Sequence, residues 1–209
     1  VLEPEKEDPP RGIQLTATEV ESGEGFVLSG TKTLVPFAET ADTAIVAART
    51  TEGYGYDGIS LFIVDQSKYE LTPLDSLDKT RPVYELTFDE VSVPEEALLG
   101  TLHGSGEAFK RSLDRYEIAL SAMLVGAAER GVELSVEHGQ NRIQYGHAVG
   151  RYQAVKHRIA DMWMDVQASR SLVYAAAWEL ANDKSGADQA VSTAKAYLSE
   201  NAASLFRDD

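Results

Sequence analysis

The chain has 209 residues, contains no cysteine, and carries 34 acidic and 19 basic side chains, which give a formal net charge of −15. Its length allows one or two domains, and the lack of cysteine excludes disulfides, thiolate chemistry and cysteine-based metal sites. The negative charge argues against nucleic acid and anionic membranes as partners, because binding to either needs clustered Lys and Arg. No apolar run approaches the ~18 residues of a membrane span, and the first residues lack a signal-peptide pattern, so we expect a cytoplasmic protein.

Residues 1–100 have the pattern of a β domain. They hold all seven prolines, from Pro4 to Pro94, together with 20 of the acidic and 7 of the basic side chains. Apolar and β-branched residues alternate or cluster in short runs that are separated by turn residues. These runs cover residues 13–17, 26–28, 43–48, 59–64 and 84–88. Several short strands at close spacing predict a small antiparallel β-barrel or sandwich.

The rest of the chain has the pattern of long helices. The 115 residues after Pro94 contain no proline, the residue that breaks helix interiors. An apolar stripe at steps of three and four, typical of a bundle helix, comprises Tyr152, Val155, Ile159, Met162, Val166, Ser169 and Val173. Apolar spacing also predicts helices over residues 109–127 and 191–202.

The composition shift near residues 95–105 indicates a domain boundary. We therefore expect an α+β multi-domain fold, in which a small antiparallel β-barrel domain over residues 1–100 precedes a helical domain over residues 104–209. The helical domain is expected to resemble a four-helix bundle, in complete or incomplete form.

No motif selects a reaction from first principles. The chain has no HExxH, GxGxxG, P-loop or GxSxG pattern. His138, His147 and His157 are not spaced four residues apart, so we interpret them as solvated or capping residues and predict no metal site. The residues alone indicate an acidic protein with a β part followed by a helical part.

Three stretches of the sequence go further. Residues 142–146, Arg-Ile-Gln-Tyr-Gly, and the following residues 150–162 resemble the R-x-Q-F-G…G-x-F-Q…A-D-M segment of acyl-CoA dehydrogenases. Residues 25–32, followed by Ala41-Asp42, look like the middle domain of that family, and residues 88–94 resemble its F-x-x-V-x-V-P strand. The order and spacing of the three stretches agree, and together they cover nearly the whole chain.

The resemblance implies a β-barrel middle domain before a four-helix C-terminal domain. It also implies an oxidoreductase that uses FAD to introduce an α,β double bond into an acyl-CoA, in fatty-acid or related acyl-CoA catabolism. In that family a glutamate removes the α-proton while the β-hydride passes to the flavin. The expected quaternary structure is a homo- or hetero-tetramer, with an electron-transfer flavoprotein as a candidate partner.

The resemblance assigns roles to five residues. Arg142 matches the family arginine that reaches the FAD pyrophosphate of a neighbouring subunit, although an exposed helix-end arginine is the alternative. Gln144, Tyr145 and Gln153 match positions that line the same cofactor, and a plain packing role for Tyr145 is an equal alternative. Asp114 matches a residue that contacts the acyl-CoA in relatives, and a solvated helix charge is the other interpretation.

The sequence departs from the family pattern at four places. The sequence contains neither the helical domain that precedes the β domain in relatives nor their Gly-rich FAD-binding segment. We therefore interpret the chain as a fragment, or as a chain from which unobserved residues were removed. Leu34-Val35-Pro36 replaces the flavin-contacting W-x-T, and leucine and proline supply neither an indole face nor a hydroxyl donor.

The catalytic base has no secure match in the chain. A minority of relatives place it where this chain has Tyr116, and the neighbouring Glu117 is rotated by ~100° around the helix. Two functions therefore stay open, an FAD-dependent acyl-CoA dehydrogenase and a catalytically silent partner subunit of a hetero-oligomeric one.

Overall fold

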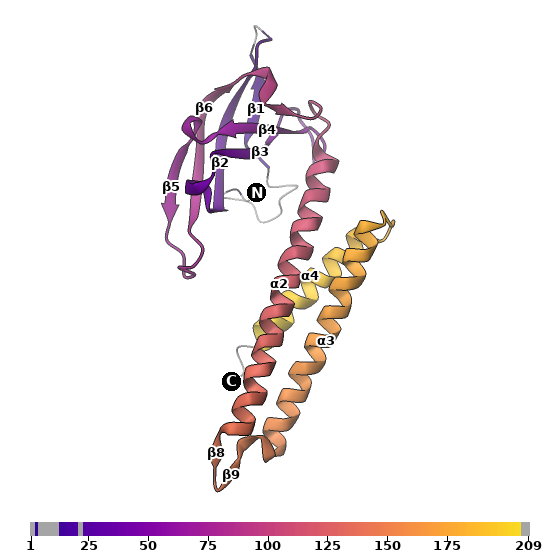
Figure 1. Ribbon diagram of the computed structural model, residues 1–209. Coiled ribbons are helices and arrows are strands. Elements are labelled where there is room, and N and C mark those ends of the chain that lie inside the picture. Colours follow the sequence, from indigo (N-terminus) through magenta and orange to yellow (C-terminus); the bar gives the residue numbers. More distant parts are fainter. Residues whose placement is uncertain (1–2, 4–12, 21–22, 206–209) are drawn as a thin grey trace. The chain divides into compact units, whose positions relative to one another are not determined.

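The computed structural model of the chain describes residue 3 and residues 13–20 and 23–205, with side chains up to residue 202. The chain divides into two compact units, residues 1–111 and residues 112–209. We refer to them as the β unit and the helical unit (Figure 1).

The β unit contains one seven-stranded sheet with the strand order β5-β6-β2-β1-β3-β4-β7. Its strands are β1 (Thr16–Glu19), β2 (Phe26–Pro36), β3 (Thr43–Arg49), β4 (Ile59–Asp65), β5 (Glu70–Leu74), β6 (Val83–Val93) and β7 (Leu98–Leu99). All neighbours pair antiparallel except β1 and β3, which meet in parallel through the single register pair Thr16↔Arg49.

The expected α+β multi-domain fold is confirmed, but closure of the sheet into a barrel was wrong. β5 and β7 are the two edges of the sheet and do not pair with each other. Both edges are weak pairing surfaces, because β5 contains Pro73 and β7 has two residues. The sheet therefore stays open.

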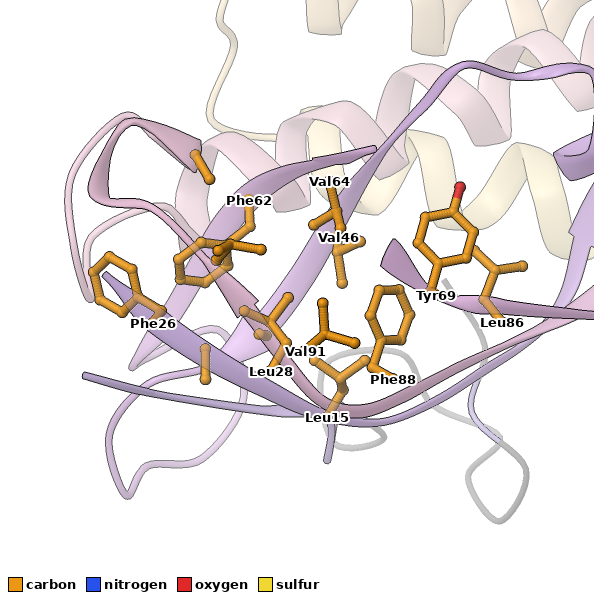
Figure 2. Close-up of a cluster of buried hydrophobic side chains, with 14 of the residues drawn as sticks. Leu15, Phe26, Leu28, Val46, Phe62, Val64, Tyr69, Leu86, Phe88 and Val91 are labelled. Atoms are coloured by element: carbon orange, nitrogen blue, oxygen red, sulfur yellow. The ribbon is translucent and has the colours of Figure 1, made fainter. Parts of the chain in front are cut away.

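The core of the β unit is one aromatic and aliphatic cluster (Figure 2). Leu28, Phe88 and Val91 lie on one side of it, and Val46 and Phe62 face them from the other part of the sheet. The alternation of buried and exposed residues along β6 and most of β4 puts their apolar side chains on one face of the sheet, and β3 adds the buried run 46–48. The sheet bends so that its two halves cover this common core.

The β unit also buries a charged pair. The Lys32 ammonium lies 2.5 Å from the Glu3 carboxylate, and both side chains are almost fully buried. The same carboxylate accepts hydrogen bonds from the backbone N–H groups of Gln14 and Leu15. Burial lowers the pKa of Lys32, and the contact with Glu3 opposes that effect. The pair fixes residue 3 against β2 and the approach to β1.

The helical unit is built from three long helices, α2 (Gly106–Asn141), α3 (Gln153–Ala181) and α4 (Ala187–Leu205). α2 begins within the β unit and continues through the helical unit. The predicted helical stretches 109–127, 152–173 and 191–202 lie within these helices, apart from Tyr152, which directly precedes α3. None of the helices that the structure describes is long and apolar enough to cross a membrane.

A short hairpin between α2 and α3 interrupts the part of the chain for which the sequence predicted only long helices. Its strands are β8 (Ile143–Gln144) and β9 (His147–Ala148), and the 3-10 turn η4 (Val149–Arg151) leads from it into α3 (Figure 1). The hairpin interrupts the helices at the stretch that carried the strongest family resemblance.

Small side chains form the core of the helical unit. One buried cluster contains Val173, Ala176, Val191, Ala194 and Leu198, together with Val125. A second cluster joins α2 to α3 through Ala128, Val132, Met162 and Val166. The large aromatic residues of α3 lie outside both clusters and are exposed.

Candidate functional site

The turn of the β8–β9 hairpin is made by Tyr145 and Gly146, which have φ angles of 51° and 81°. A two-residue loop with positive φ at both positions is a type I′ turn, which matches the twist of the two strands. Glycine adopts this conformation freely, whereas tyrosine is strained there. Tyr145 is nevertheless 91% exposed. An exposed aromatic side chain on a strained backbone is typical of a residue that contacts a ligand or another protein chain.

Three side chains share one face of this hairpin. Gln144 pairs directly with His147, and the Val149 N–H donates to the Arg142 carbonyl at 2.8 Å. Because side chains alternate between the two faces along a strand, Arg142 and Gln144 lie on the same face, and His147 lies there opposite Gln144. Arg142 is exposed, and its guanidinium makes no hydrogen bond or ion pair to any residue that the structure describes.

Two residues that follow the hairpin hold it in place. The sequence pattern assigned no role to Arg151 and placed Tyr152 in the apolar stripe of a helix. Arg151 Nη1 lies 3.2 and 3.3 Å from the two ring nitrogens of His147. The Tyr152 hydroxyl donates to the Gln144 carbonyl at 3.2 Å. Gln153, the exposed first residue of α3, comes next in the chain. The structure thus brings Arg142, Gln144, Tyr145 and Gln153 into one short region.

Next to the hairpin, the backbones of Gly139 in α2 and Gly150 in η4 are in close contact. A Cβ atom at Gly150 would lie 2.7 Å from the Gly139 carbonyl oxygen, so no larger residue fits without movement. Next to this contact, a pocket of about 590 Å³ opens between α2 and α3. It is lined by Leu134, Ser135, His138, Gly139, Ala154, Val155, Arg158, Ile159 and Met162.

The sequence around the hairpin is basic in an acidic protein. From His138 to Ala160 there is no Asp or Glu, whereas Arg142, Arg151, Lys156 and Arg158 all fall in this stretch. Of the arginines, Arg142 and Arg151 are exposed, and exposed guanidinium groups attract anions and bind phosphate oxygens in pairs. Guanidinium, amide and aromatic groups together fit a phosphate-bearing nucleotide with a flat ring.

Asp114 lies far from the hairpin. It stands near the start of α2, and Asn141 ends that helix 27 residues later, a distance of about 40 Å along the axis. Asp114 is half-buried and faces Glu117 closely enough to act on it: burial raises the pKa of Glu117 and Asp114 raises it further, while Lys195 on α4 lowers it. Tyr116 is 54% exposed. The structure does not bring Asp114 together with Arg142 of the same chain.

The end of β2 carries a strained apolar segment. Leu34 and Phe37 have φ angles of 53° and 56°, and they are 52% and 47% exposed. The pairing of β2 with β6 shifts register between Lys32 and Val35. The Phe37 N–H donates to the Pro82 carbonyl at 3.0 Å, which fixes the segment. Leu34 and Pro36 thus end β2 as exposed apolar residues, whereas Val35 between them packs against the core of the β unit.

Hydrogen bonds order the loop before α2. His103 Nδ1 lies 2.8 Å from Thr50 Oγ1, and the His103 N–H donates to the buried Ser60 hydroxyl at 2.8 Å. Thr50 and His103 line an open pocket of about 460 Å³ in the β unit. Among the residues that the structure describes, no three His, Cys, Asp or Glu side chains come together to hold a metal ion.

Two family models match the chain. The model described as acyl-CoA dehydrogenase, middle domain, matches residues 3–91, and the model described as acyl-CoA dehydrogenase, C-terminal domain, matches residues 104–208. The first match ends before the composition shift near residues 95–105, and the second begins at its end.

Individual relatives agree with the family models. The L-prolyl-(peptidyl-carrier protein) dehydrogenase of Serratia sp. is 31% identical over 172 residues, which cover 80% of this chain and 44% of that protein. Subunit CarC of the caffeyl-CoA reductase–Etf complex of Acetobacterium woodii is 29% identical over 190 residues, 89% of this chain and 50% of that protein.

A solved structure described as the FAD complex of PigA is also similar. It superposes with a TM-score of 0.86 at 28% identity, over 96% of this chain and 53% of that one. The chain thus spans about half the length of the relatives that it matches.

Proposed function

Because the chain belongs to the acyl-CoA dehydrogenase family, we propose that it binds FAD and serves in the α,β-dehydrogenation of an acyl-CoA thioester. The resemblance of the three motif stretches to this family is confirmed by the matching middle-domain and C-terminal-domain models. Members of the family are FAD-dependent oxidoreductases acting on CH–CH groups. Because the chain spans about half of its relatives, the activity of the whole protein is part of the proposal.

The observation that carries the proposal is the Arg142 guanidinium on the hairpin face. It is exposed and has no partner among the described residues, and the amide of Gln144 shares its face. A guanidinium binds a phosphate group through two parallel charge-assisted hydrogen bonds. In the proposed site Arg142 binds the FAD pyrophosphate of a neighbouring subunit, while Gln144, Tyr145 and Gln153 line the same cofactor.

The remaining residues of the chain have distinct tasks in this proposal. In this reaction class a base takes the α-proton of the thioester, and the β-hydrogen passes to the flavin as a hydride. In this proposal the exposed side chains of Leu34 and Pro36 offer an apolar surface against which a flat ring packs. Asp114 contacts the acyl-CoA, and no residue of the chain is assigned as the base.

The proposed partners follow from the surface of the helical unit and from the relatives. Trp163, Tyr174 and Trp178 on α3 are 55%, 70% and 58% exposed, which supports assembly into a homo- or hetero-tetramer through this unit. The CarC relative belongs to a complex with Etf. An electron-transfer flavoprotein is therefore our candidate partner for this protein as well.

A second function is favoured by the end of β2. Leu34, Val35 and Pro36 offer no indole face and no hydroxyl donor, and Tyr116 presents a phenol where a minority of relatives have the base. A catalytically silent partner subunit of a hetero-oligomer would fit these side chains. It differs from the first proposal in binding no flavin of its own.

Titration of the purified protein with FAD tests the proposal, with the change in flavin fluorescence as the signal. Arg142→Ala should weaken FAD binding about tenfold or more, because each charge-assisted hydrogen bond contributes ~1.5–3 kcal/mol. Arg142→Lys should recover part of the affinity, since an ammonium lacks the planar fork. Thermal melting of the apo proteins is the control, because neither change removes a packing contact. Equal affinity in all three proteins would contradict the assignment, and a protein that takes up no flavin would favour the silent subunit.

A further inference from the structure

The hairpin face carries a second guanidinium, and we propose that Arg151 binds phosphate in the same site as Arg142, with His147 as its positioning residue. This inference rests on the proposed function, because the ligand is the diphosphate of FAD. It adds a contact that the family motif did not indicate, since the motif supplied Arg142, Gln144, Tyr145 and Gln153 only.

The hairpin register brings Arg151 to this face. His147 lies opposite Gln144, on the face that also holds Arg142. Arg151 reaches back from η4 and places Nη1 at 3.2 and 3.3 Å from the ring nitrogens of His147. The Tyr152–Gln144 hydrogen bond of 3.2 Å ties the beginning of α3 to the same strand. Two guanidinium groups are thus directed to one side of a six-residue loop by backbone pairing.

The contact of Arg151 with His147 leaves the positive charge of the guanidinium available to a ligand. Arg151 Nη1 is almost equidistant from the two ring nitrogens of His147, so the guanidinium lies over the face of the imidazole ring and not on the lone pair of one nitrogen. Such a contact orients the guanidinium without neutralising it. Arg130 and Arg170 elsewhere in the helical unit differ, because they form ion pairs with Glu133 and Glu129.

The ligand that fits two such groups is a diphosphate. Its two phosphates present acceptor oxygens a few ångströms apart, and each guanidinium can bind them in a paired geometry. No Asp or Glu occurs between His138 and Ala160 to compete for either arginine along the sequence. Arg142 at the foot of β8 and Arg151 after β9 then act on the same pyrophosphate.

The test compares FAD with riboflavin, which has the same flavin ring and no phosphate, in fluorescence titrations of the full chain. Arg151→Gln should weaken FAD binding about tenfold and leave riboflavin binding unchanged, and Arg151→Lys should recover part of the loss. Lys156→Gln is the matched control, because it removes one exposed positive charge from the same acid-free stretch. Melting temperatures of the apo variants should coincide.

His147→Leu tests the positioning role. It should weaken FAD binding a few-fold in the wild-type background and have no further effect once Arg151 is Gln, because its action passes through Arg151. Equal losses from Arg151→Gln and Lys156→Gln, or equal losses for FAD and riboflavin, would overturn the inference. Loss of FAD in Arg142→Ala with full affinity in Arg151→Gln would overturn it and leave the proposed function standing. A wild-type protein that binds neither FAD nor riboflavin would contradict both this inference and the proposed function.

Discussion

The β unit and the helical unit bury very different side chains. Phe62 and Phe88 of the β unit are 0% and 2% exposed, whereas the aromatic residues of α3 are more than half exposed. Trp163, Tyr174 and Trp178 are spaced by 11 and 4 residues, which puts them within about 60° on one side of the helix. The β unit fills its own core with aromatic rings, while the helical unit packs Ala and Val inside and presents its rings outside.

The contrast shows where each unit obtains its stability. Burial of an aromatic side chain is a large term in folding, and the helical unit gains little of it from its own helices. Its exposed rings form an apolar surface along α3, and surfaces of this kind are typical of interfaces. The β unit thus buries large aromatic side chains in its own core, and the helical unit offers an apolar surface for assembly.

The largest expected effect tests this contrast directly. Phe62→Ala should lower the free energy of unfolding of the β unit by about 3–5 kcal/mol, because it removes a ring from a closed core. Trp163→Ala should cost the monomer less than ~1 kcal/mol, because the ring is already largely in water. Urea unfolding followed by far-UV circular dichroism measures both. Similar losses for the two variants would remove the distinction between the units.

A second pair of variants tests whether the helical unit is tightly packed at the contact between Gly139 and Gly150. Gly150→Ala should destabilise this unit by about 1–3 kcal/mol, because the new Cβ would lie 2.7 Å from the Gly139 carbonyl oxygen. Gly126→Ala is the matched control, since nothing lies within 4 Å of a Cβ there. It lies in the interior of α2 and should gain up to ~1 kcal/mol of helix stability.

Tryptophan fluorescence reports this second pair, because both tryptophans of the chain lie in the helical unit. The expected signature is opposite signs for the two glycine variants. Gly150→Ala should in addition weaken FAD binding, since it moves the backbone next to the hairpin. Stabilisation by both changes would mean that α2 and η4 separate easily, and that the hairpin face is not preorganised.

Local patterns predicted most strands and helices, but not how the sheet ends. Alternation marked β1, β2 and β6, and short runs of β-branched and apolar residues marked β3 and β4. β5 and β7 gave no such signal, since β5 carries Pro73 and is half-exposed and β7 has two residues. The open sheet was mistaken for a barrel because closure depends on pairing between distant edges, which no local pattern encodes.

The candidate site shows the same limit. Arg142, Gln144, Tyr145 and Gln153 came from a family motif, and their roles stay predictions. The hairpin that groups them has Tyr-Gly at its turn, which lacks the Asn-Gly or Asp-Gly signal of such loops. The shared face with His147 follows only from the register of two-residue strands, so sequence reasoning had no means of finding it.

The two units also differ in how they surround a carboxylate that is withdrawn from water, almost fully for Glu3 and partly for Glu117. Glu3 in the β unit is paired with Lys32 and receives two backbone N–H groups. Glu117 in the helical unit has Asp114 as a neighbour, and burial followed by that charge raises its pKa. A carboxyl group with a raised folded pKa favours folding below its unfolded pKa, and this contribution is lost as the pH rises through the folded value. The Glu117 charge should therefore destabilise the folded chain at neutral pH.

Glu117→Gln provides the smallest and last test. It should raise the melting temperature at pH 7, with a gain in free energy below ~1 kcal/mol because water screens a partly exposed group. The gain should vanish near pH 4, where a glutamic acid is largely protonated in the unfolded chain and in the folded one. Lys195 limits the gain, since it attracts the charged form. Glu137→Gln, an exposed change on the same helix, is the control and should show no such pH dependence. A gain of equal size at pH 4 and pH 7 would contradict this interpretation. It would show that packing at residue 117, and not its charge, lowers the stability of the folded helical unit.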